Sequence, residues 1–116
     1  MPVLAVFDAQ GSWRDTHVCD GWITEHLAGQ GVRWGRGRQK GQQVLSSAGL
    51  FYLPVADGYL GLLVEAGEWV SVPAGLPHHF DAGEAESLEG LPAALPLFEA
   101  FVEEVLSMTG NDADDQ

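Results

Sequence analysis

Short stretches rich in β-forming residues, separated by Gly, Pro and Asp, constrain the fold of this chain more than any other feature. They occupy residues 44–45, 49–55, 59–65 and 69–72. The pair Asp57-Gly58 is favoured in tight hairpin turns, and Gly67 offers a second turn further along. Pro73 and Pro77 cannot donate hydrogen bonds to a sheet, so they bracket a connection. Short strands at this spacing are typical of a β-sandwich or a β-barrel.

A helix is predicted before this β region, after a first strand at residues 3–7. Asp15 or Thr16 could cap a helix that runs to about Gly29, because apolar residues recur on one face of that stretch. His17 and His26 would then lie nine residues apart on one helix. They would point in roughly opposite directions, so they could not share a metal ion.

A second helix is predicted near the C-terminus. Pro96 stands where a first helical residue would, and Gly110 marks the stop. Apolar residues repeat on one stripe of this segment, and glutamates occupy the opposite face, so the helix is amphipathic. We expect it to pack on the outside of the β structure, with a dimer contact as the alternative.

The length of 116 residues suits one domain with a single core. We expect this domain to span residues 1–110, followed by a disordered acidic tail at residues 111–116, which has nothing apolar to bury. The single cysteine, Cys19, excludes an internal disulfide and a zinc framework. No run approaches the roughly 18 apolar residues of a spanning helix, and the N-terminus lacks the basic start of a secretory signal. A soluble cytoplasmic protein is the expectation.

The chain is strongly acidic, with a formal net charge of −12 and all five basic residues at or before position 40. Such a surface repels phosphate groups, so we expect neither nucleic acid nor membrane among its partners. Four of the five cations form a basic cluster within eight residues, namely Arg33, Arg36, Arg38 and Lys40. Two interpretations remain open: a solvated loop that interacts loosely with the acidic body, or a lining for an anionic ligand.

The segment 69–84, WVSVPAGLPHHFDAGE, predicts a strand, a tight Pro-Gly turn and a second strand that opens on two histidines. This segment resembles the second metal-binding motif of the acireductone dioxygenases, small cupins of the methionine salvage pathway. Weaker similarity to the same family extends to FDAQGSW at residues 7–13, GVRW at residues 31–34 and GLFYL at residues 49–53. The chain therefore looks like a shortened and divergent member that lacks the first metal-binding motif.

The resemblance implies a cupin barrel, here reduced, and oxygen-dependent cleavage of an enediol at one Fe(II) or Ni(II) ion. The family's ligands are a His-x-His, a Glu four residues later and a fourth histidine from the second motif. Only the fourth has a counterpart here, His78, while His79 should face the other way by strand alternation. Counting back from Gly49 places the three missing ligand positions on Trp34, Arg36 and Lys40. No His, Asp or Glu lies between His26 and Asp57.

Two functions from different classes follow. In the first, the chain is an oxidoreductase-like enzyme that acts on a small oxygenated metabolite, an enediol, a keto compound or a carboxylate, without the family's standard site. His78 would be its general acid or base and Lys40 a fixed cation, while Trp34, Arg36 and Arg38 would contact the ligand. Fe(II) or Ni(II) would bind through His78 if a metal site has been rebuilt, and otherwise no cofactor is expected.

In the second, the chain is a non-catalytic cupin that binds a ligand or a protein. Loss of the first-motif strand would expose a sheet edge, and a flat unpaired edge invites association. We therefore expect either a homodimer that pairs across the gap or a barrel patched by residues 32–45.

Overall fold

The structure, a computed structural model, describes residues 2–114, with side chains as far as Met108. Its elements in chain order are β1 (Val3–Asp8), β2 (Trp13–His17), α1 (Asp20–Ala28), β3 (Arg33–Arg36), β4 (Gly49–Val55), β5 (Gly58–Val64), β6 (Glu68–Ser71), β7 (His79–Asp81) and α2 (Phe98–Asp114). The prediction of a mainly β chain with one helix near each end is confirmed. Among residues 2–114 no helix has both the length and the apolar character needed to cross a membrane.

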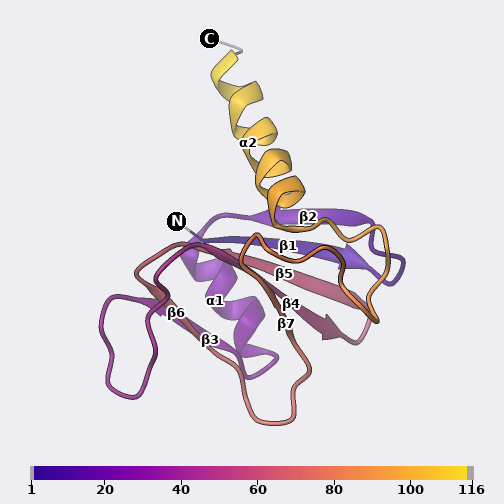
Figure 1. The fold of residues 1–116 in the computed structure, drawn as a ribbon. Coiled ribbons are helices and arrows are strands. Elements are labelled where there is room, and N and C mark those ends of the chain that lie inside the picture. Colours follow the sequence, from indigo (N-terminus) through magenta and orange to yellow (C-terminus); the bar gives the residue numbers. More distant parts are fainter. Residues whose placement is uncertain (1, 115–116) are drawn as a thin grey trace.

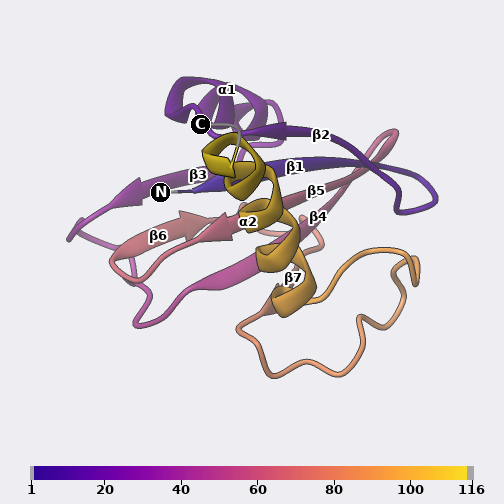
Figure 2. The same ribbon diagram turned by 90° about the horizontal axis from the view of Figure 1, so that it is seen from above.

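Five strands form one antiparallel sheet in the order β2-β1-β5-β4-β7, and β3 pairs with β6 in a separate two-stranded sheet (Figure 1). In the part of the chain that the structure describes, β2 and β7 are open edges of the larger sheet, so it does not close into a barrel. Figure 2 shows the long connection between β7 and α2 beyond the β7 edge. The finer prediction of a cupin barrel is therefore not confirmed by the fold.

The larger sheet buries a different cluster on each face, because side chains alternate along each strand. Leu4, Leu60 and Leu62 contribute to one face, where α1 supplies Ile23 and Leu27. The other face belongs to a second cluster, with Phe7, Leu50 and Tyr52 from the sheet and Phe101 from α2. Burying a side chain of this size contributes about 1.5–3 kcal/mol. The two helices thus hold the sheet from opposite sides (Figures 1 and 2).

The predicted helix start at Asp15 or Thr16 is wrong. Residues Trp13–His17 form β2, which pairs with β1, and α1 begins only at Asp20. Asp and Thr are common helix caps, but here β1 offers this segment a strand to pair with, and the pairing overrides the local signal. Val18, expected on the apolar stripe of the helix, lies in the connection and is 50% exposed.

The segment after α1, for which a solvated loop was one interpretation, contains a strand. β3 pairs with β6 in the register Trp34 to Val70 and Gly35 to Trp69. Further along, the backbone N–H of Leu45 donates to the carbonyl of Glu68 at 2.9 Å, although residues 44–45 are not a strand. Within residues 32–45, Arg33–Arg36 and the N–H of Leu45 therefore pair with β6, while the expected patched barrel is not confirmed. The homodimer stays a prediction.

One buried carboxylate joins β7 to α2. Asp81 is 2% exposed, and its Oδ2 accepts the backbone N–H of Phe98, the first residue of α2, at 2.9 Å. Its Oδ1 accepts the N–H groups of Gly83 at 2.8 Å and Ala85 at 3.4 Å. Since the N–H groups of a first helical turn lack partners inside the helix, Asp81 fixes where α2 begins.

The amphipathic helix α2 packs on the sheet through its N-terminal part, where Phe98, Phe101 and Val105 join the second cluster. Figure 1 shows the rest of the helix rising away from the sheet. The helix continues to Asp114, so the expected stop at Gly110 is wrong. Of the predicted disordered tail, residues 111–114 are helical in backbone and residues 115–116 lie outside the described residues. The division into one domain stays a prediction.

Candidate functional site

His78 lies in the connection between β6 and β7 and is exposed. Its Nδ1 is 3.1 Å from the carbonyl oxygen of Leu76, so Nδ1 is assigned as the protonated nitrogen and Nε2 as the acceptor. His79 opens β7 opposite Tyr52, and its Nδ1 is buried without a hydrogen-bond partner. Because β7 begins only at His79, the predicted alternation of the two histidines along one strand stays a prediction.

The family's metal centre has no matching ligand set in the described residues. Nowhere in residues 2–114, as far as side chains are described, do three or more His, Cys, Asp or Glu side chains gather in a way that could hold an ion. The apolar cluster under α1 instead fills the space between the two sheets, with Leu53, Leu62 and Val64 at its centre. The described residues therefore do not fit a site of three imidazoles and one carboxylate. His78 as a metal ligand stays a prediction.

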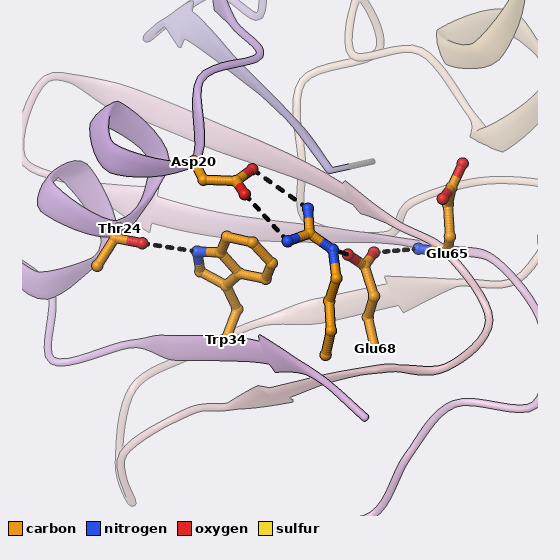
Figure 3. Close-up of polar contacts among 6 residues, drawn as sticks. Asp20, Thr24, Trp34, Glu65 and Glu68 are labelled. Carbon is orange, nitrogen blue, oxygen red and sulfur yellow. Dashed lines mark hydrogen bonds and ion pairs between the residues drawn. The ribbon is translucent and has the colours of Figure 1, made fainter. Parts of the chain in front are cut away.

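Arg36 is engaged by carboxylates (Figure 3). Its Nη1 and Nη2 donate to the two oxygens of Asp20 at 3.0 and 3.2 Å, and its Nε lies 3.2 Å from Oε2 of buried Glu68. The contact with Glu68 is an ion pair without hydrogen-bond geometry. The guanidinium also lies over the ring of Trp34, 4.9 Å from its centroid. Two carboxylates thus balance the charge of Arg36, which leaves little of it for a ligand.

The link between Asp20 and Arg36 should give the protein an acid-sensitive contact. The hydrogen bond from Arg36 lowers the pKa of Asp20 in the folded protein. The carboxylate therefore stabilises the fold above its unfolded-chain pKa of about 3.9, and this contribution is lost as pH falls through the lower folded value. We expect the difference in unfolding free energy between the natural chain and Asp20→Asn to be present at pH 6 and to shrink below about pH 4. Urea denaturation at both pH values measures it, and an equal difference at both would contradict the contact.

The other predicted site residues lie in β3 and in the segment that follows it. Trp34 is half-buried, and its Nε1 donates to Oγ1 of Thr24 on α1 at 3.1 Å. Arg38 and Lys40 are exposed in the segment that follows β3. The structure thus brings Trp34 and Arg36 together. In the described part of the chain no hydrogen bond or ion pair joins either of them to Arg38, Lys40 or His78.

A groove between α1 and β3, which the sequence did not reveal, contains a different arginine. Its volume is about 340 Å³, and its lining includes Thr24, Ala28, Arg33, Trp34, Gly35, Gln39 and Trp69. The guanidinium carbon of Arg33 lies 5.7 Å from the centre of the Trp69 ring. The indole of Trp69 packs directly across Gly35, where an added Cβ would lie only 2.5 Å from Cζ2 of the ring. We call this feature the tryptophan groove.

Trp69 gives the groove an unused donor. The residue is 4% exposed, and its Nε1 is buried with no hydrogen-bond partner. Arg33 and Gln39 are exposed side chains at the same groove. A larger cleft of about 400 Å³ has Asp8 and Asp57 beside Arg14, and two carboxylates there would repel an anion. The tryptophan groove is therefore the better candidate for an anionic ligand.

Comparison with known proteins gives one short similarity. No family model matches the chain, and no solved structure matches it. An acireductone dioxygenase from Synechococcus sp. (strain RCC307) is 53% identical over 36 residues, which is 31% of this chain and 20% of that protein. The match thus spans about a fifth of the length of that curated relative. It supports a partial likeness to the acireductone dioxygenases. It does not assign the activity of that protein to this chain.

Proposed function

We propose that the chain is a small-molecule-binding protein of acireductone dioxygenase-like descent, which takes a small oxygenated anion in the tryptophan groove. The ligand class is a keto acid, an enediol or another carboxylate. One observation carries the proposal: the groove places the Arg33 guanidinium against Trp69, whose buried Nε1 has no partner.

The energetics of the unused donor favour an acceptor in the groove. A buried N–H without a partner costs about 1–3 kcal/mol, and a ligand oxygen that accepts from it recovers part of that cost. A charged ligand gains a second contact from Arg33, because hydrogen bonds between ionised groups are stronger than neutral ones. In the described chain Arg33 has no ion pair, whereas Arg36 is held by Asp20 and Glu68. Arg33 is thus the cation that the ligand meets.

The descent from a cupin and the binding role are separable parts of this proposal. The cupin barrel would be reduced to the open sheet plus the β3–β6 pair, in which residues 32–45 take the place of the missing strand. In such a chain an apolar cluster lies under α1, and the proposed binding surface is the groove between α1 and β3. Binding there needs no Fe(II) or Ni(II).

Arg33→Gln should weaken binding of a keto acid at least about tenfold, because it removes a charged hydrogen-bond donor. Pyruvate, ascorbate and acetate serve as probes of the keto acid, enediol and simple carboxylate classes, with tryptophan fluorescence as the readout. Arg38→Gln is the matched control, since it removes the same charge from the same segment outside the groove. Equal weakening by both substitutions would mean that the probes respond to general charge, and the groove would be abandoned as the site.

A second function, an enzyme of the dioxygenase type acting through His78, is favoured by one observation. In His78 the contact between Nδ1 and the carbonyl oxygen of Leu76 leaves Nε2 as the proton acceptor, and this side chain is exposed to solvent. If this function holds, His78→Ala should lower turnover of an enediol by about 100-fold or more, as the loss of a general base does. Turnover with and without added Fe(II) or Ni(II), together with metal analysis of the purified protein, measures it. Unchanged turnover in His78→Ala would remove His78 from the chemistry.

A further inference from the structure

Two histidines that the sequence placed on opposite sides of one helix meet in the structure. His17 lies at the end of β2 and His26 on α1, with ring centroids 4.6 Å apart and planes inclined by 35°. The earlier expectation is wrong because His17 belongs to a strand. The register of β2 on β1 pairs His17 with Leu4 and Asp15 with Val6, which puts both side chains on the face that packs under α1. We call His17 and His26 the histidine pair.

Each ring of the histidine pair has one nitrogen already engaged. Nδ1 of His26 lies 2.8 Å from the carbonyl oxygen of Trp22 as a hydrogen bond, and Nε2 of His17 lies 3.4 Å from Oδ2 of Asp15 without hydrogen-bond geometry. If these nitrogens carry the protons, Nδ1 of His17 and Nε2 of His26 keep their lone pairs. His26 shows the arrangement of metal-binding histidines, in which the second ring nitrogen donates to a carboxylate or a backbone carbonyl and fixes the tautomer.

The spacing of the rings also suits one kind of ion. A ligand nitrogen lies about 2.1 Å from such a metal and the ring centre about 1.2 Å further, so two imidazoles bound at a right angle have centres about 4.6 Å apart. Tetrahedral coordination would need about 5.3 Å. Right angles between nitrogen ligands are typical of Ni²⁺ and Cu²⁺ in tetragonal sites. The observed distance of 4.6 Å between the ring centroids allows one ion to reach both rings, and imidazole ligands suit Ni²⁺ and Cu²⁺.

We propose that the histidine pair is a binding site for Ni²⁺ or Cu²⁺, with Nδ1 of His17 and Nε2 of His26 as its two protein ligands. The remaining coordination positions take water or a small external ligand, since no group of three or more ligating side chains forms in the described residues. Asp15 lies beside His17, with Oδ2 3.4 Å from Nε2. The site joins β2 to α1, lies apart from the tryptophan groove and does not depend on the ligand proposed for it.

Trp22 supplies the reporter for a test. Its ring stacks on His17 at 5.8 Å with planes inclined by 12°, and it lies 5.8 Å from the ring of His26. An open-shell ion held by the pair would quench its fluorescence. We expect NiCl₂ to quench the full-length protein in a saturable one-to-one titration, and His17→Asn and His26→Asn each to weaken that binding at least tenfold.

Two further variants separate this site from other ligands. Cys19→Ser should leave nickel affinity unchanged, although the thiol is exposed and lies two residues from His17. Loss of binding in Cys19→Ser or in His78→Asn, with binding retained in His17→Asn, would overturn the site. Electron paramagnetic resonance with CuSO₄ tests the ligands directly, even if a variant is less stable. Hyperfine coupling to two imidazole nitrogens supports the pair, and a spectrum unchanged in His17→Asn contradicts it.

Discussion

Gly58→Ala should destabilise the protein by about 3 kcal/mol, because the new methyl group has no space. Gly58 opens β5 and pairs with Asp8 of β1 on one side and Val55 of β4 on the other. A Cβ at this position would collide with the backbone oxygen of Phe7. Strands on both sides prevent β5 from moving away, so the collision must disturb the centre of the sheet. Urea denaturation followed by circular dichroism measures the loss.

Gly21→Ala is the matched control for that substitution. Gly21 lies in α1, has no heavy atom within 4 Å of its would-be Cβ, and has no positive φ. Alanine should therefore stabilise the helix by about 0.5–1 kcal/mol, the reverse of the effect at Gly58. If both substitutions destabilise the protein by similar amounts, the proposed steric collision between residue 58 and the backbone of Phe7 is contradicted.

Asp81→Ala should cost about 3 kcal/mol, since it removes an ionised acceptor from three backbone N–H groups. The N–H of Phe98 would lose its partner at the start of α2, and helix content should fall in the same samples. Asp81→Asn keeps one acceptor oxygen, so its free energy of unfolding should lie between those of the natural chain and of Asp81→Ala. Free energies from urea denaturation and far-ultraviolet circular dichroism together measure these effects.

Asp57→Ala provides the comparison for Asp81, because Asp57 is an exposed aspartate in the β4–β5 turn. Surface substitutions of this kind change stability by about 0.5 kcal/mol or less. The role of Asp81 as the link between β7 and α2 would be contradicted by a loss as small as that of Asp57→Ala, or by unchanged helix content.

The strands that were predicted well are those whose signals are local. Residues 49–55 are β4 as expected, and β5 and β6 begin within one residue of the predicted positions, because glycines and Asp57 mark the turns between them. The strands β2 and β3 were missed for the opposite reason. β2 carries helix-capping residues, and β3 carries two arginines and a glycine, so each becomes a strand only through a partner elsewhere in the chain.

The candidate site shows the same limit. The sequence placed Trp34 and Arg36 together, and the structure does bring them into contact. It could not show that Asp20 and Glu68, 16 and 32 residues away, would balance the charge of Arg36. The position of Arg33 at the tryptophan groove depends on the pairing of β3 with β6, which sets Gly35 opposite Trp69. A glycine opposite a tryptophan in paired strands was the one signal that could have revealed the groove.

The indole N–H signal of Trp69 tests the binding proposal most directly. In a ¹H–¹⁵N spectrum of the full-length protein, Trp69→Phe assigns this signal among those of the four tryptophans. Titration with pyruvate should move the Trp69 signal to lower field with saturation, because its unpartnered Nε1–H gains an acceptor, while Trp13 and Trp22, which lie outside the groove, stay in place. A Trp69 signal that stays fixed with pyruvate, ascorbate and acetate alike would contradict binding in the tryptophan groove.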